Sequence, residues 1–200
     1  MARKSTVIAA FLILVAVFLE GGCVFSPREP DGPPEGGQTE WETPITTEIV
    51  LRNLKAAIEG ESISNYLDCY TDDFTFIVDP QDYLDAGQEA EQRYGDWTKD
   101  VEQQATNNIF AQWQDIEVTF ENFEPPDESL DETYRQEDYV LSLVTLGSVP
   151  NLTVIYRGRA LLWMRRSDTG RWAIFRWEDQ RTESTGAAQT WGVLRGDSRQ

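Results

Sequence analysis

The second half of the chain contains four segments in which apolar and polar side chains alternate, and this pattern strongly limits the possible folds. Alternation with a period of two predicts strands that bury one face. A glycine-containing turn at residues 167–170 joins the last two segments and favours antiparallel pairing. We therefore expect a sheet of long antiparallel strands over residues 114–123, 137–147, 151–166 and 171–179.

Helical patterns precede these strands. Residues 44–59 repeat apolar side chains on one side, which predicts a helix with Thr43 as its N-cap. A shorter helix over 63–70, a strand at 74–78 and a polar, mostly helical stretch at 81–110 follow. This order predicts an α+β fold, in which N-terminal helices pack into the concave side of a strongly curved antiparallel sheet within a single domain.

The last two strands each divide their side chains between two faces. In residues 151–166, one face has small residues at Gly158 and Ala160, which leaves room for a helix or a ligand to pack against it. The pattern leaves open which face lines the interior. In the final strand, strict alternation sets Trp172, Ile174, Arg176 and Glu178 against Ala173, Phe175, Trp177 and Asp179.

Composition excludes several classes of function. The chain has 200 residues, of which 12% are aromatic, enough for one domain with a sizeable core. It contains no histidine, which excludes Ser-His-Asp and Cys-His catalysis and histidine-ligated zinc. The formal net charge of -18 disfavours a nucleic-acid partner, because the phosphate backbone is also negative.

Residues 1–22 have the layout of a secretory signal. Arg3 and Lys4 form a basic start, residues 7–19 are apolar, and two glycines precede Cys23. As a helix, the apolar run spans about 20 Å, short of the roughly 30 Å hydrocarbon core of a bilayer. We therefore expect a cleaved signal and no permanent membrane span.

This N-terminus resembles that of bacterial lipoprotein precursors, whose motif reads Leu, small, small, Cys. It departs from the motif because Glu20 stands three places before Cys23 and Leu19 lies one place too early. The resemblance implies a diacylglyceryl (palmitate-type) lipid on Cys23 and cleavage before it. Because Val24 follows, it also implies the outer membrane, facing the periplasm. The alternative is an ordinary signal that leaves Cys23 free or disulfide-bonded.

The remaining segments complete the expected organisation. Residues 23–43 are rich in proline, glycine and acidic residues and predict a flexible tether after the lipid cysteine. The folded domain covers 44–181, and 182–200 is a polar, frayed tail from which Trp191 could dock. We expect Cys69 to be packed in the core rather than reactive, since no histidine is present to activate it.

Two stretches, residues 53–80 and 170–179, resemble the nuclear transport factor 2-like superfamily, including its SnoaL-like branch. They contain a helical pair, an acidic turn at Asp72-Asp73, a Phe-x-Phe strand and a final strand that reads Gly-Arg-Trp…Trp-Glu-Asp. The resemblance implies a cone with one cavity between sheet and helices. The superfamily includes isomerases, dehydratases, cyclases, docking modules and ligand binders, so the fold alone does not identify the function.

The resemblance also suggests candidate site residues. Asp79 as a base and Tyr66 as a hydrogen-bond donor could abstract a proton next to a carbonyl. We favour the simpler interpretation that Asp79 caps a turn and Tyr66 belongs to the core. The candidate ligand contacts are Tyr66, Tyr83, Tyr156 and Trp177.

Acidic clusters are interpreted as solvated surface. Asp79, Asp82 and Asp85 recur every third residue, but this is not the spacing of a calcium loop, so we expect a solvated acidic loop. Residues 121–138, with Arg135 as their only basic residue, predict a solvated acidic hairpin. We expect neither a metal nor a cofactor.

Three functions remain open from the sequence. The first is a lipid-anchored envelope protein that binds a small apolar or amphipathic ligand, or a partner protein, in the cone without chemistry. The second is an isomerase- or dehydratase-type enzyme, which requires a buried carboxylate with a raised pKa in a closed cavity. The third is an interaction module that forms a homodimer, which requires an exposed apolar patch. We favour the first.

Overall fold

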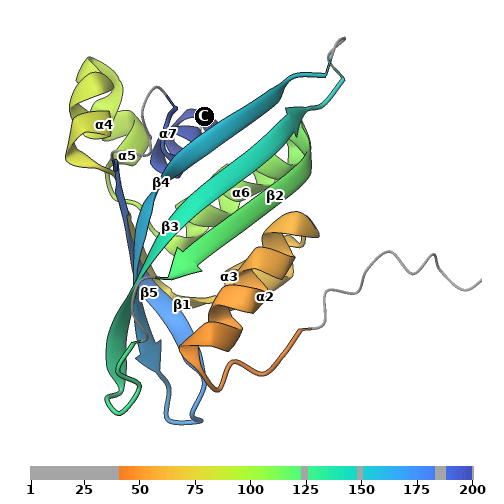
Figure 1. Cartoon of the computed structure of the whole chain (residues 1–200). Coiled ribbons are helices and arrows are strands. Elements are labelled where there is room, and N and C mark those ends of the chain that lie inside the picture. Colours follow the sequence, from red (N-terminus) through yellow and green to blue (C-terminus); the bar gives the residue numbers. More distant parts are fainter. Residues whose placement is uncertain (1–40, 123–125, 148–150, 183–187, 200) are drawn as a thin grey trace, which may run out of the picture. The chain divides into compact units, whose positions relative to one another are not determined.

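A computed structural model describes residues 41–122, 126–147, 151–182 and 188–199 (Figure 1). The predicted signal, Cys23 and most of the tether therefore lie outside the described residues. Within the described residues, no helix is both long enough and apolar enough to cross a membrane.

The first described helix, α2, spans Thr47–Glu59 and turns an apolar side that includes Leu54 and Ile58 into the core. It begins later than predicted, because Thr46 rather than Thr43 is its N-cap and accepts a hydrogen bond from the amide of Ile49. The carbonyl of Pro44 instead accepts a hydrogen bond from the amide of Trp172, 2.7 Å away. The chain before α2 is therefore tied to the sheet.

The predicted helical content of residues 81–110 is confirmed. It divides into three α-helices and the short 3-10 turn η1 (Gly87–Glu89). The helices after α2 are α3 (Ile63–Asp68), α4 (Pro80–Asp85), α5 (Ala90–Tyr94), α6 (Lys99–Gln112) and α7 (Trp191–Ser198).

The sheet has the order β1-β5-β4-β3-β2. Its strands are β1 (Tyr70–Ile77), β2 (Trp113–Asn122), β3 (Glu132–Thr145), β4 (Thr153–Arg166) and β5 (Trp172–Gln180). β2 to β5 form the expected antiparallel series, whereas β1 pairs parallel with β5. Figure 1 shows α2 and α6 beside the same face of the curved sheet. The predicted α+β fold is confirmed, with one parallel pair at an edge.

A bulge in β5 corrects the predicted alternation of this strand. Met164 of β4 pairs with Ile174 and Trp163 pairs with Arg176, so Phe175 is an extra residue. The bulge shifts the following side chains by one position. As a result, Trp177 and Asp179 are buried on the same face as Ile174, whereas strict alternation placed them on the opposite face.

The acidic hairpin is also shorter than expected. β3 begins at Glu132, so Arg135 and Glu137 lie within a strand and are buried. The guanidinium of Arg135 pairs with the carboxylate of Glu137 at 2.8 Å and with that of Glu48 at 2.9 Å. A solvated hairpin is therefore wrong for this part of the segment, because Arg135 and Glu137 form an ion pair that is buried in the domain.

The C-terminal segment is not a frayed tail where it is described. Residues 191–198 form α7, which lies against α6 and α5. Thr190 caps the helix by accepting a hydrogen bond from the amide of Val193. Trp191, Leu194 and Arg195 are buried, so this helix closes the interior of the domain.

Candidate functional site

Arg195 reaches the centre of the domain from α7, and its side chain is fully buried. Trp191 and Arg195 are four residues apart, so they project from the same side of the helix. The Nε of Arg195 donates to Glu102 of α6 at 3.0 Å, and its Nη2 donates to the hydroxyl of Tyr66 at 3.1 Å. The polar centre of the domain is therefore supplied partly by its C-terminal helix.

Glu102 is the acceptor around which this centre is organised. Its Oε1 accepts from Arg195 and from the hydroxyl of Tyr66, and its Oε2 accepts from the indole of Trp97 at 2.7 Å. Burial raises the pKa of the Tyr66 phenol, so this group stays protonated and able to donate. A carboxylate with three donors, one of which is the guanidinium of Arg195, is well satisfied despite complete burial.

Aromatic rings enclose the guanidinium of Arg195. Its central carbon lies 3.9 Å from the ring centroid of Trp177, 4.6 Å from that of Phe76 and 4.9 Å from that of Trp191. Arginine above an aromatic face is attracted by the ring quadrupole, and more strongly when both groups are desolvated. Glu102, Tyr66 and these rings together form what we call the arginine site.

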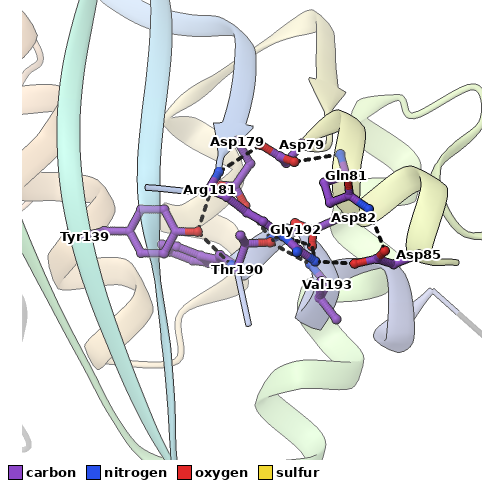
Figure 2. Close-up of polar contacts among 11 residues, drawn as sticks. Asp79, Gln81, Asp82, Asp85, Tyr139, Asp179, Arg181, Thr190, Gly192 and Val193 are labelled. Carbon is purple, nitrogen blue, oxygen red and sulfur yellow. Dashed lines mark hydrogen bonds and ion pairs between the residues drawn. The ribbon is translucent and has the colours of Figure 1, made fainter. Parts of the chain in front are cut away.

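A second polar cluster fixes the beginning of α7 (Figure 2). The hydroxyl of Tyr139 donates to Asp179 at 2.8 Å and accepts from the amide of Trp191 at 2.7 Å. The other oxygen of Asp179 accepts from the amide of Gly192 at 2.5 Å. Burial raises the pKa of Asp179 to about 7, although these hydrogen bonds and Arg195 oppose the shift.

The three regularly spaced aspartates hold secondary structure together instead of forming a solvated loop. Asp82 is buried; it accepts from the hydroxyl of Thr190 at 2.6 Å and from the Nε of Arg181 at 2.7 Å. Asp85 pairs with Arg181 at 2.7 Å. Asp79 is the N-cap of α4 and accepts from the amides of Gln81 and Arg181 (Figure 2). The described residues contain no acidic or cysteine cluster suited to a metal ion.

The interior cavity that the described residues line is very small. The cavity between the helices and the sheet has a volume of about 10 Å³ and is lined by apolar side chains together with Tyr66, Thr106 and Trp191. A cavity of this size holds no more than one water molecule. A small ligand inside the cone, as expected from the sequence, therefore has no room while α7 is docked.

An apolar cleft lies instead on the surface beside β1 and α4. Its volume is about 490 Å³, within the range of ligand pockets. Tyr83 and Leu84 at this cleft are 38% and 69% exposed. The cleft is lined by Phe76, Ile77, Val78, Pro80, Tyr83, Leu84 and Tyr94.

The structure separates the four candidate ligand contacts. Tyr66 and Trp177 meet at the arginine site, whereas Tyr83 belongs to the surface cleft. Tyr156 lies apart from both, in β4, where it forms a parallel bridge with Gln189. Burial raises the pKa of its phenol.

Sequence reasoning missed the residues that dominate the interior: Glu102, Tyr139, Asp179 and Arg195. Of these, Arg195 has a usable signal in the sequence. The spacing of Trp191 and Arg195 places both on one helical side. Alternation places Asp179 on the same face of β5 as Trp177, which is correct. It does not predict that this face is buried, because the bulge at Phe175 is what directs both side chains into the core.

Solved structures with a similar fold come from several bacteria. A candidate scytalone dehydratase from Novosphingobium aromaticivorans aligns with a TM-score of 0.54 and 12% identity, over 68% of this chain and 80% of that one. A ketosteroid isomerase-like protein from Erwinia carotovora atroseptica has a TM-score of 0.50 and 17% identity, over 68% and 93%. A candidate calcium/calmodulin-dependent protein kinase type II association domain from Thiobacillus denitrificans has a TM-score of 0.50 and 14% identity, over 71% and 99%.

These likenesses define the class of the domain. The chain has the nuclear transport factor 2-like fold, as its sequence motifs suggested. At identities this low, the likeness establishes the fold alone. No protein-family profile and no curated protein matches the sequence. The activity must therefore be argued from this chain's own residues.

Proposed function

We propose that the protein is a lipid-anchored binding protein of the bacterial cell envelope, and that the surface cleft holds the apolar part of an amphipathic ligand without chemistry. One observation carries this proposal. The interior leaves about 10 Å³, whereas the apolar cleft beside β1 and α4 offers about 490 Å³. Ligand binding requires a concave apolar surface of the larger size.

The chemistry of the cleft supports an amphipathic ligand. Its wall is apolar, and a polar group stands close by, because the hydroxyl of Tyr83 donates to Glu91 at 3.0 Å. With a formal net charge of -18, the chain favours a neutral or cationic head group over an anionic one. Burying an acyl chain or ring against Leu84 and Ile77 supplies the binding energy.

The arrangement of the buried acids argues against catalysis. Asp179 has the raised pKa expected of a catalytic acid or base. However, both of its oxygens are occupied by Tyr139 and Gly192, and it lines neither the interior cavity nor the surface cleft. No substrate reaches this carboxyl while α7 is docked.

The anchor is the second part of the proposal. The sequence before the domain combines a basic start, a short apolar run, Cys23 and a proline- and glycine-rich tether. A lipid on Cys23 would hold the domain near a bilayer, which is itself a source of amphipathic molecules. Val24 after the cysteine supports an outer-membrane location facing the periplasm.

A dye titration tests the binding site. The chain from Val24 to Gln200 is titrated with Nile red, a neutral apolar dye, and compared with Leu84→Asp. A charge in the cleft should weaken dye binding about tenfold or more, because it must be desolvated. Leu130→Asp is the matched control, since Leu130 is 60% exposed and lies outside the cleft.

The outcomes distinguish the remaining functions. Native mass spectrometry of the same chain should show a co-purifying molecule of a few hundred daltons, which Leu84→Asp loses. Equal dye affinity in the Leu84→Asp and Leu130→Asp variants would exclude the cleft. A bare dimer that binds no dye would favour the interaction module.

A further inference from the structure

We propose that the arginine site is a binding site for the arginine side chain of a peptide ligand, and that α7 fills this site in cis. The ligand chemistry is a planar guanidinium cation that enters between aromatic rings and pairs with a buried carboxylate. This inference concerns the interior, which shares only Phe76 with the lining of the surface cleft proposed above.

The arginine site is selective for a guanidinium. Glu102 accepts from the Nε of the group, and the hydroxyl of Tyr66 accepts from its Nη2. The ring of Trp177 lies 3.9 Å from the guanidinium carbon, which is a stacking distance for a flat cation. A lysine ammonium has neither the planar face nor the forked donors that this arrangement uses.

Most of the site belongs to parts of the domain other than α7. Glu102 comes from α6, Tyr66 from α3, Phe76 from β1 and Trp177 from β5. Only the ring of Trp191 leaves together with the C-terminal helix. Both the carboxylate and the ring stacked on the guanidinium therefore persist when α7 moves away, so the site is largely preformed for another occupant.

Some hydrogen-bond donors at the arginine site have no acceptor in the described part of the chain when Arg195 occupies it. Among the described residues, its Nη1 is buried without a hydrogen-bond partner, and so is the indole nitrogen of Trp177. Each buried unpaired donor disfavours the docked state. A peptide that brings an acceptor beside its arginine would satisfy the site better than α7 does.

α7 is also suited to leaving the site. It has eight residues, too few for a stable helix outside the protein, so docking and helix formation occur together. Residues 181–190 connect it to β5. Its beginning is held by Asp179 and Asp82, and its end by the ion pair between Asp197 and Arg93. Asn108 of α6 also donates to the carbonyl of Ser198 at 2.8 Å, so an incoming peptide would have to compete with polar contacts at both ends of the helix.

Chemical rescue tests the specificity of the site. The full chain with Arg195→Ala is purified in detergent and titrated with N-ethylguanidinium or with N-ethylurea, its neutral analogue. Saturating N-ethylguanidinium should raise the midpoint of thermal unfolding by about 5 °C. N-ethylurea should not change it. The wild type, whose site is filled, and Arg157→Ala, which removes an exposed arginine of β4, should respond to neither compound.

A second variant separates the site from general effects of the cation. Arg195→Ala combined with Glu102→Gln keeps the space and the rings but removes the carboxylate, so the response to N-ethylguanidinium should disappear. If Arg195→Ala alone is unfolded, recovery of the near-ultraviolet circular dichroism of its buried tryptophans replaces the melting temperature as the readout. Equal responses to both compounds, or no response, would overturn the assignment of a guanidinium site.

A peptide arm tests the proposed ligand class. A labelled peptide of residues 188–200 should bind the Arg195→Ala protein saturably, and the same peptide with Arg195→Ala should bind at least tenfold more weakly. Binding of N-ethylguanidinium without binding of the arginine peptide would overturn the peptide proposal in favour of a small guanidinium compound. Equal binding of both peptides would show that the arginine is not recognised.

Discussion

Arg195 of α7 and Glu102 of α6 form an ion pair of 3.0 Å in which both side chains are fully buried. The pair joins the C-terminal helix to the centre of a cone that leaves little room for a ligand. Tyr66, Trp97 and the surrounding rings offset part of the cost of burying these two charges. In this state the interior of the domain is occupied by side chains of α7.

Glu102→Gln should destabilise the domain strongly. The substitution leaves the buried guanidinium of Arg195 without its counter-charge, which typically costs about 3–5 kcal/mol. In a chain of this size we expect the midpoint of thermal unfolding to fall by about 10 °C. Tryptophan fluorescence during heating measures the change.

Glu89→Gln is the control for this prediction, because Glu89 pairs with Arg93 on the surface with 59% of its side chain exposed. Its loss should cost less than about 1 kcal/mol. Combining Glu102→Gln with Arg195→Met should recover at least half of the stability, since no buried charge remains unpaired. Equal effects of Glu102→Gln and Glu89→Gln would contradict the buried ion pair.

Asp179 should make stability depend on pH. Burial raises its pKa from 3.8 to about 7 in the folded protein, so the folded state binds more protons than the unfolded state between these values. The resulting stabilisation is complete below about pH 4 and is lost as the pH rises to about 7. Relative to Asp179→Asn, the wild type should lose up to about 4 kcal/mol over this range.

Urea unfolding at pH 4, 5.5, 7 and 8 measures this difference. Asp127→Asn is the control, because a hydrogen bond from Ser129 lowers the pKa of Asp127 and its contribution therefore has the opposite sign. A constant difference between the wild type and Asp179→Asn at all four pH values would show that Asp179 titrates normally.

Gly196→Ala should loosen α7. A Cβ at this position would lie 2.8 Å from the ring carbon Cζ of Tyr94, closer than packed atoms normally approach. Alanine favours the helix by about 1 kcal/mol, but overpacking costs about 1–3 kcal/mol. With a net loss of about 1 kcal/mol, amide exchange in α7 should become about fivefold faster. Leu130→Ala, at an exposed position outside α7, should leave the exchange within about twofold of the wild type.

Periodicity predicted most of the fold, but not the bulge or the parallel pair. The alternation in β4 assigns its two faces correctly, because each residue there has one partner on β3. In β5, Phe175 is inserted between two paired residues, and no pattern in the sequence marks it. The parallel pairing of β1 with β5 depends on contacts between residues about a hundred positions apart in the sequence. Local sequence patterns carry no information about such contacts.

The arginine site was harder to predict because its charged side chains are buried, whereas charged side chains are usually exposed to solvent. Glu102 lies in a polar helix, where a glutamate normally faces solvent. α7 contains two glycines and two charged residues, so its composition indicates a loose tail. Its structure comes instead from tertiary contacts of Trp191 and Arg195. From the sequence, only the prediction that Trp191 could dock indicated that this segment packs against the domain.

Cys23→Ser tests the proposed anchor. Without the thiol no lipid can be attached, so the protein should become soluble or accumulate as an unprocessed precursor in cell fractionation and intact-mass measurements. Cys69→Ala is the control, because Cys69 is buried in the domain and its loss should leave the lipid in place. Membrane partitioning and mass that do not change in Cys23→Ser would exclude lipidation.

Hydrogen exchange of the α7 amides is the most direct test of a cone filled by its own C-terminal helix. The docked helix predicts that the amides of Leu194 to Ser198 exchange slowly at pH 6, as do those of the central strand β4. Exchange at the rate of an unstructured peptide, while β4 remains protected, would contradict the docked helix and would open the interior to a ligand.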